Sequence, residues 1–259
     1  ACELGCWGLL AGLLRRRGQP PERLLLWAWN PAALVEVAGS GHNEPFGLLF
    51  VTLALLALEL PRRAGAAAAL VAGTLAKVVP ALLAVAWLRR LRVRDLALAS
   101  LAGLLLYVPY LDARQGLFRT LGAYGDFWRF NQTVFAALEA VAGTAAPGLA
   151  AALLLAVLAL LAARVTDAVH GGALALAAWL LLSPSVLPWY ALWLLPFAVL
   201  GAGAWTTTFS LSSALAYLVY VGYAPGGAWQ VEWSVRLAEY GLPLAVLFGQ
   251  WRRRARGRP

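Results

Sequence analysis

Residues Leu149–Leu161 read LAAALLLAVLALL, an apolar run without a polar interruption. Strands of a membrane barrel alternate apolar and polar residues, whereas this run does not, so a helix is favoured. Similar Leu/Ala-rich runs recur along the chain, for example at Ala66–Leu70. In hydrocarbon a helix satisfies its backbone hydrogen bonds within its own segment. We therefore expect an all-α protein.

The composition extends this expectation from one run to the whole chain. Of 259 residues, 62% are apolar and only 13% are Asp, Glu, Lys or Arg. A soluble domain is usually about 45–50% apolar and about 25% charged. With so few charges, much of the surface must face lipid. The composition thus excludes an ordinary soluble domain and predicts a polytopic integral membrane protein.

The net charge of +9 suggests nucleic-acid binding at first sight, but its distribution argues against it. The arginines form short clusters between apolar runs, as at Arg15–Arg17, Arg62–Arg63 and Arg89–Arg90. Basic loop anchors on the cytoplasmic side of a membrane protein have this pattern. We expect no nucleic-acid partner, and a multi-pass chain in the cell membrane with a cytoplasmic C-terminus.

About ten to eleven transmembrane or half-spanning helices are predicted. Residues 65–88 have arginines at both ends, so they are interpreted as two half-spans that turn near Lys77–Pro80. Several segments are nearer to ~15 residues than to the ~20 of a full span, which predicts broken helices around a solvated cavity. The expected apolar segments are 1–14, 24–38, 46–60, 65–88, 95–111, 148–163, 169–183, 190–203, 205–222 and 234–251.

Lys77 lies inside an apolar segment beside Pro80. Burying an ammonium group in the membrane costs several kcal/mol, so such a residue needs a partner or an anionic ligand. A lysine that snorkels to the interface or caps carbonyl groups is the structural alternative. The functional interpretation makes Lys77 a phosphate-binding residue.

His42, Asn43 and Glu44 follow a glycine at the outer end of the second apolar segment, with Glu36 near the end of that segment. A His and two carboxylates at such a mouth suit a general base, a sugar-hydroxyl acceptor or a metal site. No second His lies nearby, so no metal is predicted.

The stretch 112–139 combines charged and aromatic side chains and predicts an amphipathic helix on the non-cytoplasmic surface. Arg114, Arg119 and Arg129 depart from the positive-inside pattern there. Guanidinium groups match phosphate bidentately, so donor-phosphate binding and lipid-headgroup anchoring both remain open for them. Asp126 adds a second candidate base to this stretch.

A rigid outer turn is predicted at 183–190, which reads SPSVLPWY. Trp189 and Tyr190 suit an aromatic belt at the interface or a platform for sugar stacking. The chain contains no G-x-x-x-x-G-K-[ST], H-E-x-x-H or G-x-S-x-G motif, so we expect neither a nucleotide site nor another cofactor.

Four strings in this order resemble the GT-C glycosyltransferases, especially the bacterial α-mannosyltransferase-like branch of the family 87 type. They are Trp29-Asn30-Pro31 followed by Glu36 and Gly41–Glu44; Gly73–Pro80; Trp128–Asn131 with Phe135; and Ser183-Pro184 with Pro188–Tyr190. The resemblance spans about residues 1–200.

This resemblance implies a hexosyltransferase that moves a sugar, by analogy mannose, from a polyprenyl-phosphate donor to a lipid or glycan acceptor on the non-cytoplasmic face. Glu44 or Asp126 then assists as catalytic base, and Lys77, Arg114, Arg119 and Arg129 hold the donor phosphate. The sugar or acceptor is bound by Glu36, His42, Asn43, Trp128, Asn131, Trp189 and Tyr190.

In the GT-C superfamily the catalytic carboxylate usually lies in the first outer loop. The chain begins without Met inside an apparent helix. We therefore expect residues 1–259 to form a single GT-C-like domain that lacks its N-terminal helices and that loop. The alternative function is a transporter or flippase of lipid-linked saccharides, which should carry polar residues near the midplane of both halves.

Overall fold

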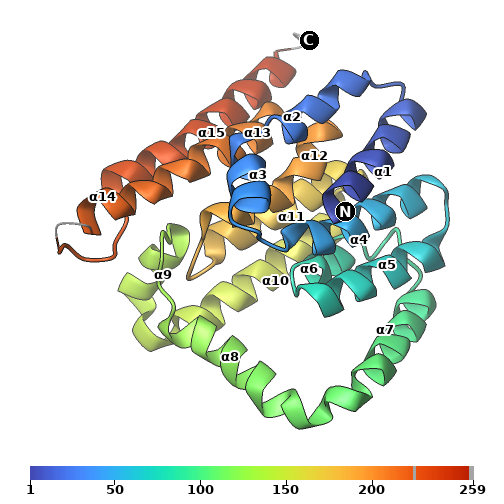
Figure 1. Cartoon of the computed structure of the whole chain (residues 1–259), viewed down its shortest axis with the longest axis horizontal. Helices are drawn as coiled ribbons and strands as arrows, with labels where there is room; N and C mark the ends of the chain where they lie inside the picture. Colours follow the sequence, from blue (N-terminus) through green and yellow to red (C-terminus); the bar gives the residue numbers. More distant parts are fainter. Residues whose placement is uncertain (224–225, 257–259) are drawn as a thin grey trace. The chain divides into compact units, whose positions relative to one another are not determined.

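The computed structural model describes residues 1–223 and 226–256, with the side chains at 111–115, 117, 118, 121, 126, 254 and 255 left out. Within these ranges the regular structure is helical, and an isolated bridge between Phe130 and Ser185 is the one pairing of extended backbone. The expected all-α class is therefore confirmed. Figure 1 traces the helices along the chain.

The chain divides into two compact units. The first unit contains residues 1–9 and 45–185, and the second contains residues 10–44 and the chain from residue 186 onward. The single domain expected for residues 1–259 stays a prediction.

The first unit consists mainly of long helices that follow one another in sequence. Beyond the first turns of α1 (Cys2–Arg16), they are α4 (Glu44–Glu59), α5 (Arg63–Ala76), α6 (Pro80–Ala86), α7 (Val93–Tyr107), the 3-10 turn η3 (Val108–Ala113), α8 (Arg114–Phe127), α9 (Val134–Ala142), the 3-10 turn η4 (Gly143–Ala145), α10 (Ala146–Arg164) and α11 (Ala168–Leu182).

Within this unit α5 packs on α6 and α7, and α10 packs on α6, α9 and α11. Phe135 of α9 forms a buried cluster with Ala146 and Ala150 of α10. In Figure 1, α7 and α8 meet at an angle at η3. The predicted helix in the stretch 112–139 is thus present as α8, and its position on an outer leaflet stays a prediction.

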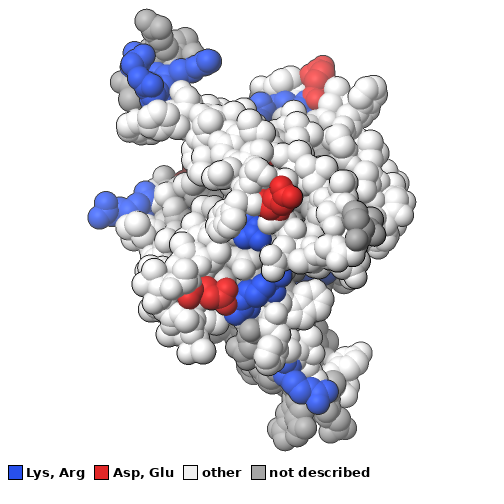
Figure 2. Space-filling model, turned by 90° about the vertical axis from the view of Figure 1, so that its left-hand side faces the viewer, with Lys and Arg blue, Asp and Glu red and all other residues white. Residues whose placement is uncertain are grey.

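Two helical stretches of the described chain are long and apolar enough to cross a membrane, Val93–Tyr110 and Val134–Arg164. In the first, only 6% of the residues are buried, so its leucines form an apolar outer surface. Figure 2 likewise shows a face where charged side chains lie in small separate patches. A surface of this kind is suited to hydrocarbon. The larger number of spans expected from the sequence is not confirmed.

The second unit contains mostly shorter helices, together with one helix of 23 residues at positions 233–255. They are the end of α1, the 3-10 turn η1 (Pro21–Leu24), α2 (Leu25–Ala28), α3 (Pro31–Ala33), the π-helix η2 (Leu34–Gly39), the 3-10 helix η5 (Pro188–Leu194), α12 (Leu195–Val199), α13 (Ala204–Ser212), the 3-10 helix η6 (Ser213–Leu218), α14 (Val219–Tyr223) and α15 (Trp233–Ala255).

The core of this unit is built by η5 and α12, whose residues from Ala191 to Val199 are buried. Helices α13 and α15 pack on each other. The sequence predicts an apolar membrane segment at 190–203, but the helical stretch Pro188–Val199 is short and enclosed by its own unit. An apolar stretch of this length can be a buried core helix or a membrane segment, and apolarity alone does not distinguish the two.

Proline and glycine determine where the expected segments break. Segment 24–38 is divided at Pro31, which lacks an N–H and occupies the first turn of α3. Segment 65–88 is divided into α5 and α6, with Pro80 in the first turn of α6. The predicted turn near Lys77–Pro80 is therefore confirmed. A Cβ added to Gly73 would lie 3.1 Å from the Pro80 ring, so glycine permits this close approach.

Candidate functional site

The second unit positions Glu36 through a capped helix start. The Asn30 side chain accepts a hydrogen bond from the Ala32 N–H at 3.0 Å, which caps α3, and donates one to Ser210 Oγ at 2.7 Å. Asn30 is 3% exposed. The Trp29-Asn30-Pro31 string thus fixes the start of the segment that carries Glu36.

After α3 the backbone continues as a π-helix over Leu34–Gly39. The Ser40 N–H donates to the Val35 carbonyl at 2.8 Å, and the His42 N–H donates to the Glu36 carbonyl at 2.9 Å. Between them Gly41 has φ +72°, a left-handed conformation that favours glycine. This turn brings His42 back over Glu36. π-Helical turns are rare and occur frequently at functional sites.

His42 lies between two carboxylates. Its Nε2 is 3.5 Å from Glu36 Oε2, and its Nδ1 is 3.8 Å from Glu44 Oε2. Both glutamate side chains are 1% exposed, whereas the imidazole is 28% exposed. The imidazole is therefore the part of this group that a ligand can reach from outside.

Two aromatic side chains complete the arrangement. The Trp189 ring stacks on the His42 ring, with centroids 4.0 Å apart and planes inclined by 24°. The Tyr217 hydroxyl donates a hydrogen bond to Glu36 Oε1. We call Glu36, His42, Glu44, Trp189 and Tyr217 the His42 cluster. It combines two acids, one base and a flat aromatic face.

Four members of this cluster are predicted from the sequence, and the structure brings them together. Tyr217 was not predicted because it lies 181 residues from Glu36 and no local motif marks it. Tyr190 lies beside Trp189 in an edge-on contact at 6.1 Å. Asn43 is exposed in the loop before α4.

The first unit holds the third string of the resemblance and the Ser183-Pro184 part of the fourth, and these two are in contact. The Phe130 N–H donates to the Pro184 carbonyl at 3.3 Å. The Tyr124 hydroxyl donates to the Ser185 carbonyl at 2.8 Å. Asn131 is 1% exposed and has φ +52°, so it makes the bend that ends this contact.

Arg129 is held in place by its own surroundings. Its Nε donates to Glu139 Oε1 at 2.7 Å, its Nη1 donates to the Gly125 carbonyl at 2.9 Å, and its guanidinium lies over the Phe135 ring at 4.9 Å. We call Arg129 and Glu139 the Arg129 pair. The Glu139 carboxylate already compensates the charge of the Arg129 guanidinium, which would otherwise be available to a donor phosphate.

Of the other predicted residues of this unit, Trp128 contacts the Arg129 pair through its backbone, because Arg129 Nη1 donates to the Trp128 carbonyl at 3.1 Å. Trp128 is 57% exposed, with its ring stacked near Tyr124 at 6.2 Å. Arg119 is exposed on α8. The side chains of Arg114 and Asp126 lie outside the described residues.

Lys77 ends α5. Its backbone is extended, with φ −153° and ψ 139°, and its N–H donates to the Gly73 carbonyl at 2.8 Å. The residue is half-buried at the break between α5 and α6. In the described residues no group of three His, Cys, Asp or Glu side chains is arranged to hold a metal ion.

Comparison with known families gives a match in the C-terminal half of this chain. Residues 120–248, about half of the chain, are similar to the model of the MptB C-terminal domain, a mannosyltransferase-related family. This similarity supports the general GT-C kind of glycosyltransferase expected from the four strings. The matched range includes the Arg129 pair, Trp189 and Tyr217. Comparison with curated proteins and with solved structures gives no match.

Proposed function

We propose that this chain belongs to a membrane glycosyltransferase that moves mannose from a polyprenyl-phosphate donor to a lipid or glycan acceptor on the non-cytoplasmic face. The observation that carries the proposal is the similarity of residues 120–248 to the MptB C-terminal domain. The long apolar helices at 93–110 and 134–164 support a membrane location.

The His42 cluster is proposed to act on the acceptor. In the transfer step the acceptor hydroxyl loses its proton, its oxygen bonds to the anomeric carbon, and the bond from that carbon to the phosphate oxygen breaks. The imidazole of His42 takes the proton, because it is partly exposed whereas the two carboxylates beside it are buried. Glu36 and Glu44, at 3.5 and 3.8 Å, then stabilise the imidazolium that forms.

The remaining members of the cluster position the acid and the substrate. Tyr217 holds Glu36 by its hydroxyl. Trp189 offers a flat face against which a sugar ring can pack. Tyr190 and Asn43, which lie next to this group in the sequence, are proposed to contact the acceptor.

The departing phosphate needs cations. Lys77, Arg119 and Arg114 are proposed for this task, together with Trp128 and Asn131 as contacts to the sugar. Arg129 is proposed to fix the loop that carries Trp128 and Asn131, since its charge is compensated by Glu139. Asp126 stays a second candidate for the base.

The test is transfer of radiolabelled mannose from polyprenyl-phosphate-mannose in membrane vesicles that contain the protein expressed from its complete gene. Transfer that is lost in His42→Gln and in Lys77→Ala supports the class and the two sites. Vesicles that move a labelled lipid-linked saccharide across the bilayer, without any transfer, would instead identify a transporter.

The kinetic constants of these two variants distinguish the two sites, and a matched control variant accompanies them. His42→Gln should lower kcat with little effect on the donor KM, whereas Lys77→Ala should mainly raise the donor KM. Ser40→Ala changes an exposed side chain two residues from His42 and should leave both constants unchanged.

A further inference from the structure

The first unit contains a basic pocket at the start of α5 and the end of α6. Its volume is about 350 Å³, within the usual range of about 300–1,000 Å³ for ligand sites. Three arginines line it, Arg63 from the first turn of α5 and Arg89 and Arg90 from the turn after α6. Its described lining includes no acidic residue.

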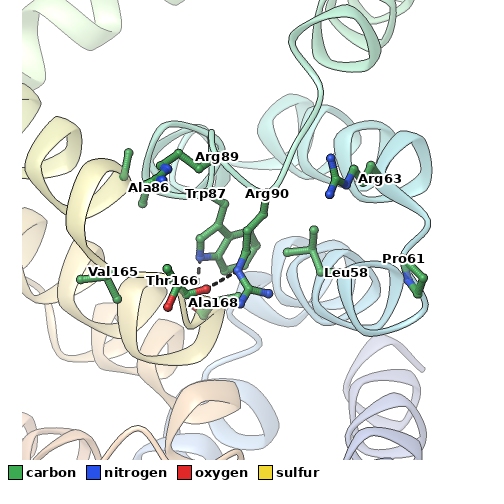
Figure 3. Close-up of a pocket in the computed structure, with 11 residues that line it drawn as sticks. Leu58, Pro61, Arg63, Ala86, Trp87, Arg89, Arg90, Val165, Thr166 and Ala168 are labelled. Atoms are coloured by element: carbon green, nitrogen blue, oxygen red, sulfur yellow. Dashed lines mark hydrogen bonds between the residues drawn. The ribbon is translucent and has the colours of Figure 1, made fainter.

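Backbone carbonyls hold two of these arginines in place. Arg89 Nη1 donates to the Ala163 carbonyl at 2.6 Å, and Arg90 Nε donates to the Thr166 carbonyl. Beside them the Trp87 indole N–H donates to the Ala168 carbonyl at 2.9 Å. Figure 3 shows the last two bonds and, on the far side of Leu58, Arg63. Because a guanidinium carries five N–H donors, one bond of this kind orients it and leaves donors for a ligand.

The pocket lies at the ends of the two long apolar stretches. The stretch Val93–Tyr110 begins shortly after Arg90, and the stretch Val134–Arg164 ends directly before Val165 and Thr166, which line the pocket. If these stretches cross hydrocarbon, the pocket lies at the depth of the lipid headgroups. Basic pockets at this depth between membrane helices bind anionic headgroups.

A second pocket of about 680 Å³ continues the first one and shares Pro61 and Arg63 with it. It adds Arg62, Arg92 and Arg94, with Asp95 as its acidic residue. The positive charge of this region therefore exceeds what its described acidic lining compensates, which favours an anionic ligand.

We propose that the first pocket binds the phosphate headgroup of an anionic phospholipid. Arg63 and Arg90 bind the phosphate oxygens, and Leu58 and Val165 contact the apolar part of the lipid where it enters the pocket. This site is separate from the residues proposed for the sugar donor, and the inference does not depend on the proposed transfer reaction.

The experiment is native mass spectrometry of the purified whole protein in detergent, titrated with dioleoyl phosphatidylglycerol or dioleoyl phosphatidylcholine. We expect phosphatidylglycerol to bind about tenfold more tightly than phosphatidylcholine. Arg63→Gln/Arg90→Gln should weaken phosphatidylglycerol binding about 25-fold, because each arginine near an anionic group contributes roughly fivefold.

The matched control is Arg15→Gln/Arg16→Gln, which removes the same charge from exposed arginines in the last turn of α1 and should change binding less than about twofold. Equal weakening in both pairs would reduce the effect to general surface charge and overturn the proposal. So would equal binding of the two lipids.

Two further arms complete the test. If inorganic phosphate at millimolar concentration displaces phosphatidylglycerol, the pocket is a site for a free phosphate ion. That result would overturn the proposal that it binds a lipid. Arg63→Gln alone leaves the bond from Arg90 to Thr166 intact and should weaken binding about fivefold. If the double variant does not fold, an unchanged affinity in this single variant overturns the proposal.

Discussion

The Arg129 pair and the His42 cluster both place charged side chains below the surface, but they balance charge differently. In the Arg129 pair one guanidinium meets one carboxylate at 2.7 Å, and the two side chains are 25% and 36% exposed. In the His42 cluster two carboxylates that are 1% exposed surround one partly exposed imidazole. A matched pair fixes a loop, whereas an excess of buried acid beside a reachable ring provides a proton acceptor.

The largest effect is expected at the ring itself. His42→Gln keeps a polar side chain of similar size but removes the proton acceptor. We expect kcat for mannose transfer to fall by about 10²–10⁴, the range for the loss of a general base. This change in kcat is measured by steady-state kinetics of mannose transfer in vesicles. If kcat falls less than about threefold, the cluster has no proton-transfer role and the contrast with the Arg129 pair disappears.

A smaller effect is expected at Tyr217, which donates to Glu36 beside the His42 ring. Tyr217→Phe removes the donor to Glu36, and a hydrogen bond to a charged group is worth about 1.5–3 kcal/mol, or about 10–100-fold in kcat/KM. Steady-state mannose transfer in vesicles measures this loss.

The control for this prediction is Tyr220→Phe, whose ring stacks on Tyr217 at 6.0 Å. It keeps the bond from Tyr217 to Glu36 and should leave kcat/KM close to that of the unchanged protein. Equal losses of kcat/KM in Tyr217→Phe and Tyr220→Phe would show that the bond to Glu36 does not assist the reaction.

For the Arg129 pair we expect a loss of stability that a second substitution restores. Arg129→Met leaves Glu139 without its partner and should lower the free energy of unfolding by about 1–2 kcal/mol, since the pair is only partly buried. Arg129→Met/Glu139→Met removes both charges and should regain most of that loss. Thermal unfolding in detergent measures both variants.

Transfer activity of the same two variants then separates the proposed roles of Arg129. If Arg129 fixes the loop, the double variant is active. If Arg129 contacts the donor phosphate, the double variant is stable but its donor KM remains raised.

An effect as small as that of Arg129→Met is expected at the cap that positions Glu36. Asn30→Ala removes the α3 cap and the bond to Ser210, at a cost of about 1–2 kcal/mol of stability. Ser210→Ala combined with Asn30→Ala gives a double-mutant cycle. The double variant should lose less stability than the sum of the losses in the two single variants. Full additivity would show that the bond does not couple these residues.

The sequence predicts a structural feature correctly where residues close together in the chain cause that feature. The break at Lys77 follows from Pro80, which cannot donate in a helix, and Glu36, His42 and Glu44 lie within one short segment. Trp189 was assigned to a sugar platform or a belt from its type and its place in a turn. Its stacking on His42 requires the fold of the second unit.

Interactions between distant residues were beyond the sequence. The bond from Tyr217 to Glu36 and the bond from Asn30 to Ser210 each join residues about 180 positions apart, and no pattern marks Tyr217 or Ser210. The compensation of Arg129 by Glu139 does not follow from the sequence either, because the bend at Asn131 lies between the two residues in the chain.

The π-helix at Leu34–Gly39 has a consequence for how this segment tolerates change. A π-helical turn contains more residues than an α-helical one, so deleting a single residue such as Ala38 would let the backbone close as an ordinary α-helix. Each residue of an α-helix turns the chain by about 100°. His42 would then emerge on another side of the segment, away from Glu36. Apart from Glu36, chain length in this segment is constrained more tightly than residue identity, and alignments of related sequences should show substitutions at its other positions but no gaps.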